Sequence, residues 1–293
     1  MIITSCGNSV SIAKSLAREL HAKYCHLDIS AFPDGDIYLK FNSSLKGQQV
    51  VIVHSFQPHP DMSLFDVIWA AETAKDLGAK KVTLIAPYLA YMRQDKRFNP
   101  GEAVSSRIMA KLLNKSIDKI ITIDPHLHRY KSLKDIFTIS SIKLTANNVI
   151  ADYIQRNIKN PVIIGPDNES YQWAESIAKN IKVQSTVLEK TRFSSHHVSV
   201  KIINPIPLKG QNVVIVDDII STGHTMAEAA KKAHKQGAKS ITAVCVHGLF
   251  AGDALEHLAK AGVSKVVSTN TIKHKTNGID VTSLLVSELK KRK

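Results

Sequence analysis

Two adjacent carboxylates, followed closely by hydroxyl groups and a glycine, form the segment of the chain with the clearest chemical character. A run of Val and Ile leads into an Asp-Asp pair, and Ser-Thr-Gly-His-Thr follows three residues later. Hydroxyls and unpaired N–H groups at a helix start suit a phosphate, and glycine lets the backbone approach the anion. Carboxylates beside a phosphate would repel it unless they hold sugar hydroxyls or a metal. The segment therefore predicts a site for a phosphorylated sugar, made by Asp217, Asp218, Ser221, Thr222, Gly223, His224 and Thr225.

Two further segments concentrate positive charge. Arg93, Lys96 and Arg97 lie within five residues, and Lys190 and Arg192 lie within three. Guanidinium and ammonium groups hold polyphosphates, and Arg also stacks on bases. By charge alone, each segment fits a solvated surface loop as well as it fits a nucleotide site.

Histidine and aspartate also follow predicted strands at two places. Asp124-Pro125-His126 follows the run at 120–123, and Asp167 follows the run at 162–164. Carboxylate and neutral imidazole both ligate divalent cations. A histidine at a strand end is more commonly structural. These residues therefore indicate a metal site only together with other motifs.

Short strands and helices alternate along the chain and would position these groups. Continuous Val/Ile runs without polar alternation are typical of strands buried on both faces of a parallel sheet. The expected strands are Ile2–Thr4, Val50–His54, Val82–Ala86, Ile120–Ile123, Val162–Ile164, Val183–Leu188, Val198–Ile202, Val213–Val216, Ile241–Val246 and Val263–Val267. The expected helices are Ser9–Leu20, Met62–Leu77, Val104–Leu113, Ala146–Ile158, Ser170–Asn180, Thr225–Lys235 and Ala254–Ala261. This alternation predicts an α/β fold with parallel sheets and flanking helices.

An internal repeat indicates a duplication. Residues 47–54 (GQQVVIVH) match residues 210–217 (GQNVVIVD) at six of eight positions, and each copy leads through a helix to Gly-Ala-Lys. Two copies of one α/β unit explain this pattern better than chance does. We therefore expect an N-terminal domain over 1–145 and a C-terminal domain over 146–293. Only the second copy carries the Asp-Asp pair; the first has His54 and Ser55 there.

The composition excludes several classes of protein. The chain has 293 residues, a net charge of +14, 44% hydrophobic residues and three cysteines, which argues against disorder and a disulfide scaffold. No apolar window is long enough for a membrane span, and the first residues do not read as a signal peptide. We expect reduced, buried thiols in a cytoplasmic protein. The positive charge suits anionic partners without choosing among nucleic acids, membranes and phosphorylated metabolites.

The Asp217–Thr225 segment resembles the phosphoribosyl diphosphate loop of the phosphoribosyltransferase fold. Four other segments are similar to motifs of the ribose-phosphate pyrophosphokinases, in the same order and at similar spacing, so the resemblance spans almost the whole chain. They are Phe32–Asp36 (FPDGD), Tyr91–Arg97 (YMRQDKR), Asp124–His126 (DPH) and Gly165–Asp167 (GPD). The resemblance implies two tandem phosphoribosyltransferase-like domains, each a mainly parallel sheet flanked by helices.

The resemblance also implies roles for individual residues. In such a protein, Lys190 and Arg192 would stabilise the transition state, and Mg²⁺ would lie near His126 and Asp167. ATP would contact Phe32, Asp34, Gly35, Asp36, Arg93, Gln94, Asp95 and His126, with the adenine read by residues 32–36 of a neighbouring subunit. Two positions depart from the family pattern: Asp36 stands where Glu is usual, and Asn168-Glu169-Ser170 stands where best-known members have His-Gly-Gly.

The implied activity is Mg²⁺-dependent transfer of the β,γ-diphosphoryl group of ATP to the C1 hydroxyl of ribose 5-phosphate, giving 5-phosphoribosyl 1-diphosphate and AMP. The expected assembly is a homo-oligomer with the dimer as its smallest competent unit, or a tetramer or hexamer. No membrane or nucleic-acid partner is expected. Two alternatives remain: a phosphoribosyltransferase that consumes phosphoribosyl diphosphate, and a non-catalytic regulatory homologue.

Overall fold

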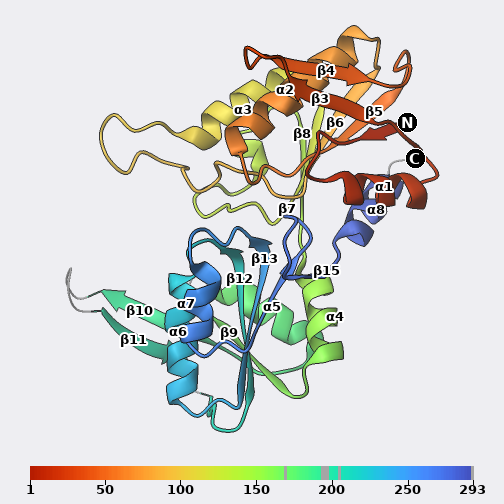
Figure 1. Ribbon diagram of the computed structural model, residues 1–293. Helices are drawn as coiled ribbons and strands as arrows, with labels where there is room; N and C mark the ends of the chain where they lie inside the picture. The colour runs from red at the N-terminus through yellow and green to blue at the C-terminus, as the bar shows by residue number, and fades with distance from the viewer. Residues whose placement is uncertain (168–169, 193–197, 204–205, 292–293) are drawn as a thin grey trace. The chain divides into compact units, whose positions relative to one another are not determined.

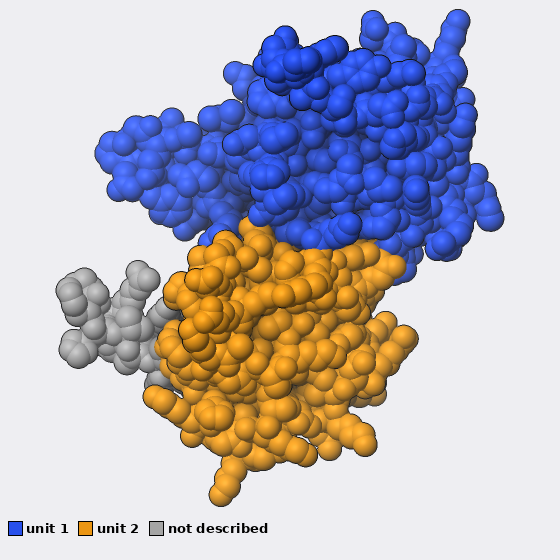
Figure 2. Space-filling model, in the orientation of Figure 1, with its two compact units in different colours: residues 1–144, 271–273, 282–293 blue, residues 145–270, 274–281 orange. Residues whose placement is uncertain are grey.

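The computed structural model describes residues 1–167, 170–192, 198–203 and 206–291, without the side chains of residue 172 and of residues 187–203. Its internal contacts divide the chain into two compact units (Figure 2). Unit 1 comprises residues 1–144, 271–273 and 282–293, and unit 2 comprises residues 145–270 and 274–281. Two short C-terminal segments thus belong with the N-terminal half. The expected domains 1–145 and 146–293 stay a prediction, since contacts do not show which residues fold independently.

The main sheet of unit 1 is entirely parallel, with the strand order β2-β1-β5-β6-β7-β8. Its strands are β1 (Ile2–Thr4), β2 (Lys23–Tyr24), β5 (Gln49–Val53), β6 (Lys81–Ala86), β7 (Lys119–Ile123) and β8 (Ser140–Leu144). Its helices are α1 (Val10–Glu19), α2 (Pro60–Asp76), α3 (Ser105–Ser116) and α8 (Thr282–Lys290), with a 3-10 turn, η1, at Leu133–Asp135. The run Val50, Val51, Ile52 and Val53 is wholly buried, as expected for a central parallel strand covered on both faces.

The C-terminal part of unit 1 docks onto its beginning. Helix α8 packs against α1 although the two are separated by most of the chain (Figure 1). Leu285 of α8 is buried, as are Ile12 and Leu16 of α1. The Ser55 hydroxyl also donates a hydrogen bond to the carbonyl oxygen of Thr271. Burial of apolar side chains from both ends of the chain therefore stabilises unit 1.

A two-stranded antiparallel hairpin stands apart from the main sheet. Its strands are β3 (Leu27–Ala31) and β4 (Ile37–Phe41), neither of which the hydrophobic runs predicted. The hairpin has few consecutive apolar residues because one of its faces is exposed. Its register pairs Ala31 with Ile37. The turn between these two residues carries the segment 32–36.

Unit 2 has one seven-stranded sheet, with the order β11-β10-β9-β12-β13-β14-β15. All neighbours are parallel except the hairpin of β10 and β11. Its strands are β9 (Pro161–Gly165), β10 (Ser185–Arg192), β11 (Val198–Ile203), β12 (Asn212–Ile220), β13 (Ser240–Gly248), β14 (Lys265–Thr269) and β15 (Asn277–Ile279). Its helices are α4 (Asn147–Asn157), α5 (Tyr171–Ile181), α6 (His224–Lys235) and α7 (Ala254–Lys260). The core between this sheet and helices α6 and α7 is built from aliphatic side chains such as Ile215, Ala230 and Leu258.

These two sheets confirm the expected α/β class. Cys6, Cys25 and Cys245 are free and buried, as expected. Among the described residues, no helix combines the length and the apolar character that crossing a bilayer requires.

The internal repeat is reproduced in backbone hydrogen bonds. In each unit, the N–H group of a glycine before the strand donates to the carbonyl oxygen of the glycine that ends the following helix. Two residues after that second glycine, the N–H group of a lysine donates to the carbonyl oxygen of the residue that follows the first glycine. In unit 1 these bonds join Gly47 N to Gly78 O and Lys80 N to Gln48 O, and in unit 2 they join Gly210 N to Gly237 O and Lys239 N to Gln211 O, each at 2.8 Å. Gly78 and Gly237 have φ angles of 82° and 79°, a left-handed conformation that favours glycine. The two copies therefore share geometry as well as sequence.

His54, the unit 1 counterpart of Asp217, is buried with 2% of its surface exposed. Within the described residues, neither ring nitrogen has a hydrogen-bond partner, and burial lowers its pKa from 6.5 to about 4. The ring must therefore be neutral in the folded protein, whereas the unfolded chain takes up a proton below pH 6.5. Stability should fall as the pH drops from 6.5 to 4, by about 3 kcal/mol from this group.

Urea unfolding at a series of pH values checks this prediction. His54→Leu should lose most of the decline between pH 6.5 and 4, while the exposed His59→Leu should keep it. An equal decline in wild type and His54→Leu would contradict the assignment.

Candidate functional site

The predicted phosphate site of unit 2 lies where β12 leads into α6. The strand runs on to Ile220, beyond the expected end at Val216, because β13 continues to pair with it as far as Gly248. Asp217 and Asp218 therefore lie within the strand, near its carboxyl end. Residues 221–223 form the connection, and the helix begins at His224. The structure thus brings the acidic pair and the hydroxyl segment together, as predicted.

The start of α6 is open to an anion. Gly223 precedes the helix with a φ of 77°, and a Cβ at this position would lie 3.2 Å from the carbonyl oxygen of Ala254. No side chain caps the helix, and its first turn has no acidic residue. The Thr222 hydroxyl and the His224 Nδ1 are 2.9 Å apart. Uncapped N–H groups with the positive end of the helix dipole can hold a phosphate here.

The carboxylates of unit 2 crowd one another. Burial raises the pKa of Asp217 well above its usual range, and the negative charges of Asp218 and Asp167 raise it further. Backbone N–H of Asp218 donates to Asp217 Oδ1 at 2.9 Å. Asp217 and the two carboxylates that act on it are a donor set whose negative charge a divalent cation or several sugar hydroxyls would stabilise.

Asp167 is held by a tight local turn after β9. Its Oδ1 accepts hydrogen bonds from the backbone N–H and the hydroxyl of Ser170, both at 3.0 Å. In return, the Asp167 N–H donates to Ser170 Oγ at 3.1 Å. Ser170, part of the departure from the family pattern, therefore orients the predicted metal ligand. The other two residues of that departure, Asn168 and Glu169, lie outside the described residues.

In unit 1, the predicted ATP contacts Arg93 and Gln94 line a surface pocket of about 630 Å³. Tyr91, Glu102, Ala103 and Ser105 complete its lining. Sequence analysis missed Glu102, which holds the segment before it: its carboxylate accepts from the N–H groups of Phe98 (2.7 Å) and Asn99 (3.0 Å). Hydrogen bonds, foremost from the Asn99 side chain, lower the pKa of Glu102. The turn sequence Asn-Pro-Gly directly before Glu102 is the signal that could have located it.

Asp95, another predicted ATP contact, is buried in unit 1. Its Oδ1 accepts a hydrogen bond from Arg129 Nη1 at 2.7 Å, and its carbonyl oxygen accepts from the Tyr130 hydroxyl at 3.2 Å. The carboxylate therefore ties the 93–97 segment to the segment after β7. Its contact with ATP stays a prediction.

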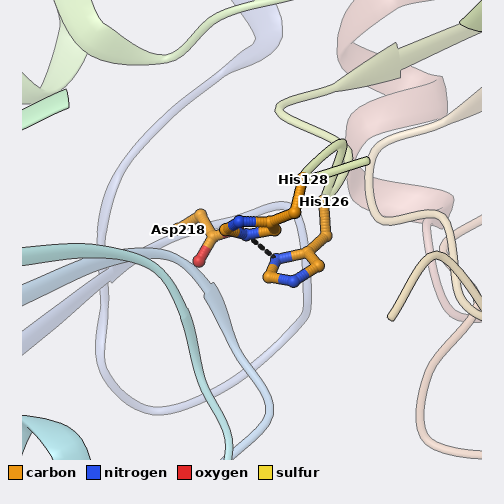
Figure 3. A group of neighbouring side chains, drawn as sticks. All are labelled: His126, His128 and Asp218. Carbon is orange, nitrogen blue, oxygen red and sulfur yellow. Dashed lines mark hydrogen bonds between the residues drawn. The ribbon is translucent and has the colours of Figure 1, made fainter. Parts of the chain in front are cut away.

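The segment after β7 carries a pair of histidines. His126, the predicted metal ligand, is partly buried, and His128 is exposed. His128 Nε2 lies 2.9 Å from His126 Nδ1, and the ring centroids are 3.6 Å apart (Figure 3). Sequence analysis did not single out His128; its signal was the His-x-His spacing.

The predicted adenine-reading segment forms the tip of the β3–β4 hairpin. Phe32 N donates to Asp36 O at 2.8 Å, and Gly35, with a φ of 95°, donates from its N–H to Phe32 O at 2.9 Å. Asp36 N donates to Asp34 Oδ1 at 3.3 Å. The Phe32 ring is 50% exposed and meets Tyr38 edge to face. An aromatic face and two carboxylates are therefore presented at the surface.

Lys190 and Arg192 lie on strand β10, not in the loop that the sequence suggested. Their backbones pair with Val200 and Val198 of β11. The antiparallel partner pairs with β10 from Val187 to Arg192, so the strand continues past the apolar run that marked the expected end. Residues 193–197, which join the strands and include part of the expected loop, lie outside the described residues.

Comparisons with known proteins cover nearly the whole chain. Residues 1–116 match a family model described as the N-terminal domain of ribose phosphate pyrophosphokinase, and residues 132–284 match one described as a phosphoribosyl transferase domain. The ribose-phosphate pyrophosphokinase of Saccharolobus solfataricus is 36% identical over 98% of each chain. That of Methanothermobacter thermautotrophicus is 34% identical over 99% of this chain and all of its own. The crystal structure of phosphoribosylpyrophosphate synthetase from Mycobacterium smegmatis superposes with a TM-score of 0.85 at 25% identity, covering 99% of this chain and 97% of the other.

Proposed function

The chain belongs to the ribose-phosphate pyrophosphokinase family, and from this membership we propose its reaction: ATP and ribose 5-phosphate give 5-phosphoribosyl 1-diphosphate and AMP. The C1 hydroxyl oxygen of the sugar attacks the β-phosphorus of ATP and loses its proton. The bond between the β-phosphorus and the oxygen bridging to the α-phosphate breaks, and AMP leaves with that oxygen. The β,γ-diphosphoryl group is thereby transferred intact.

The observation that carries this proposal is the match of both halves of the chain over nearly the full length of the relatives. A phosphoribosyltransferase that only consumes phosphoribosyl diphosphate would not need an N-terminal domain of this family. A regulatory homologue would not need to retain Asp217, Asp218, Lys190 and Arg192, which are all present. Neither alternative is favoured by a feature of the chain.

In unit 2, we assign Asp217 and Asp218 to the ribose hydroxyls and the β12–α6 connection to the 5-phosphate. The hydroxyls of Ser221, Thr222 and Thr225, with the first N–H groups of α6, would hold the phosphate oxygens. Carboxylates accept hydrogen bonds from sugar hydroxyls and repel phosphate. The acidic pair and the phosphate-binding connection therefore hold different parts of the sugar and fix its orientation. Orientation of this kind lowers the barrier without covalent chemistry.

In unit 1, we assign Arg93 and Gln94 to ATP, together with His126. Lys190 and Arg192 would supply positive charge where it builds up on the transferring group, which is the main catalytic task of a phosphoryl-transfer enzyme. The hairpin tip with Phe32, Asp34, Gly35 and Asp36 would read the adenine of a neighbouring subunit.

Magnesium fits the carboxylate donors of unit 2, and His126 of unit 1 would add an imidazole. Asp167 is oriented by Ser170, and the negative charges of Asp218 and Asp167 add to burial in raising the pKa of Asp217. We propose that Asp167 and His126 hold Mg²⁺, which when bound neutralises charge on the ATP phosphates. The expected cytoplasmic location is retained as part of this proposal.

A product assay tests the proposed function. Untagged protein is mixed with ATP, Mg²⁺ and ribose 5-phosphate, and AMP and phosphoribosyl diphosphate are followed together. The proposal expects both products in equal amounts. Consumption of phosphoribosyl diphosphate with a purine or pyrimidine base would support the transferase instead. Binding of phosphoribosyl diphosphate without AMP formation, with or without added inorganic phosphate, would support the regulatory role.

We propose a homodimer as the smallest unit, formed through helices α2 and α3. These packed helices expose large apolar side chains: Met62, Phe65 and Trp69 on α2, and Ile108 and Leu112 on α3. Exposed charges of opposite sign flank these side chains, with Asp61, Glu72 and Asp76 on α2 and Arg107, Lys111 and Lys115 on α3. A twofold axis would place α2 of each copy on α3 of the other, so both apolar contact and charge are self-complementary.

Trp69→Asp is expected to weaken this dimer by about 30-fold or more, since a buried interface tryptophan is a typical hot spot. Trp69 is 44% exposed in the single chain and packs edge to face with Phe65. Sedimentation equilibrium measures the effect. Lys179→Asp, an added acidic residue on unit 2, serves as control and should leave association unchanged. Unchanged association of Trp69→Asp would place the dimer contact elsewhere.

A further inference from the structure

Helix α7 packs against α6 and against the β12–α6 connection, residues 221–223 (Figure 1). A Cβ on Gly223 would lie 3.2 Å from the carbonyl oxygen of Ala254 and 3.5 Å from the side chain of Leu258, both on α7. The chain just before α7 also holds the connection, because the N–H of Ala251 donates to its first carbonyl oxygen at 3.0 Å. The position of the β12–α6 connection therefore depends on α7 and the segment that leads into it.

A pair of histidines joins α7 to the start of α6. His224 is the first residue of α6 and is exposed, whereas His257 lies on α7 and is partly buried. Their ring centroids are 5.0 Å apart, and the ring planes are tilted by 60°. This separation and tilt are typical of a favourable contact between aromatic rings. The His257 ring therefore limits the directions in which the exposed His224 ring can turn.

The Nδ1 atom of His257 is buried, and within the described residues it has no hydrogen-bond partner. A buried polar atom without a partner lowers the stability of the fold, and an aliphatic side chain at the same position would avoid that loss. A histidine here therefore costs stability, and its ring contact with His224 indicates a task at the start of α6.

His224 in turn contacts a hydroxyl that the proposed function places against the phosphate. Its Nδ1 lies 2.9 Å from Oγ1 of Thr222. A hydroxyl has one proton to donate and can accept a further hydrogen bond at its oxygen. When the Thr222 proton points to a phosphate oxygen, the Nδ1–H of His224 can donate to Oγ1, and this second hydrogen bond fixes the direction of the hydroxyl.

We infer that His257 is a positioning residue for the 5-phosphate of ribose 5-phosphate: it holds the His224 ring against Thr222, and Thr222 donates to the phosphate. The inference rests on the proposed function, which assigns this phosphate to the β12–α6 connection. Because His257 acts through His224 and not on the reacting atoms, its loss should weaken binding of the sugar phosphate and leave the chemical step unchanged.

Calorimetric titration of the full, untagged chain tests the inference, with ribose 5-phosphate and phosphoribosyl diphosphate as separate probes that share the 5-phosphate. His257→Ala should bind both probes about 10-fold more weakly than wild type, as expected when one hydrogen bond to a charged group is misdirected. His257→Phe keeps a ring of similar shape and should retain nearly the wild-type affinity. His234→Ala, which removes an exposed histidine near the other end of α6, is the matched control and should bind like wild type.

A double-mutant cycle and steady-state kinetics separate positioning from a purely structural role. His224→Ala should itself weaken binding, and adding His257→Ala should cause no further loss, because the side chain through which His257 acts is then absent. In AMP formation, His257→Ala should raise the KM for ribose 5-phosphate while kcat and the KM for ATP stay nearly unchanged. A residue needed only for the fold would change all three constants together.

Four results would overturn the inference: wild-type affinity in His257→Ala, an equal loss in His257→Phe or in His234→Ala, additive losses in the double variant, or no binding of either probe by the wild type. AMP formation by the wild type is measured separately. Its absence, alongside a loss of sugar-phosphate affinity in His257→Ala that depends on His224, would contradict the proposed reaction and leave the role of His257 standing.

Discussion

Lys190→Ala is expected to lower kcat by about 10²- to 10³-fold, with little change in the KM for either substrate. The reason is that the negative charge on the transferring diphosphoryl group and the departing AMP oxygen is greatest in the transition state. A cation that acts there stabilises the transition state more than the bound substrates, so its loss appears in kcat. Steady-state AMP formation, with ATP and ribose 5-phosphate varied separately, measures both constants.

The β10–β11 hairpin supplies a matched control for this prediction. Lys201 of β11 pairs through its backbone with Glu189, the neighbour of Lys190. Lys201→Ala removes the same charge from the same hairpin and should leave kcat nearly unchanged, because Lys201 is not assigned to the transferring group. Equal losses in the two variants would show that the hairpin acts through its overall charge. A rise in KM alone in Lys190→Ala would assign Lys190 to substrate binding.

Asp217→Asn should do two opposite things: lower kcat/KM by about 10²- to 10³-fold and stabilise the protein at neutral pH. Activity falls because an amide cannot replace a carboxylate that accepts hydrogen bonds from ribose hydroxyls. Stability rises because burial and the charges of Asp218 and Asp167 make ionisation of Asp217 unfavourable in the folded chain. Such a trade-off is expected of a binding residue and not of a residue kept for the fold.

The pH dependence of folding stability gives the sign of the stabilisation expected from Asp217→Asn. The folded-state pKa of Asp217 is raised above its usual 3.8, so the folded protein holds this proton more tightly than the unfolded chain. Stability from this group is therefore complete below pH 3.8 and declines as the pH rises toward the raised pKa. Asp217→Asn removes that decline, and its melting temperature should exceed that of wild type at pH 7.

Thermal unfolding at pH 4 and pH 7 measures the difference between wild type and variant, which should grow with pH. Asp253→Asn, an exposed position before α7 in the same unit, should change neither melting temperature nor activity. A lower melting temperature for Asp217→Asn at pH 7 would contradict the predicted repulsion.

Much of the fold could be predicted from sequence because its determinants are local. Buried Val/Ile runs such as Val50–Val53 identify strands covered on both faces, and they appear in the structure where they were expected. The repeat predicted two related units, and the glycines of its two copies take the same left-handed conformation. The chemistry of the Asp217–Thr225 segment could also be predicted, because it follows from the types and the spacing of its carboxylate, hydroxyl and glycine residues.

Other features depend on partners that are distant in sequence. The extent of β12 and β10 follows from how far β13 and β11 supply hydrogen bonds, so Lys190 lies on a strand although its own apolar run had ended. Two side chains hold the 93–99 segment. Arg129, which follows β7, donates a hydrogen bond to Asp95, and Glu102 accepts one from the N–H group of Phe98 across a turn. The place of α8 in unit 1 follows from its packing on α1.

The same division holds for the candidate site. Residue types and spacing determined which groups can bind phosphate, sugar and metal. Only the tertiary structure decided that Asp217 lies near two other carboxylates, that Asp95 is buried against Arg129, and that the rings of His126 and His128 meet. The physical reason is that burial, charge repulsion and ligand geometry depend on distances through space, which local sequence does not specify.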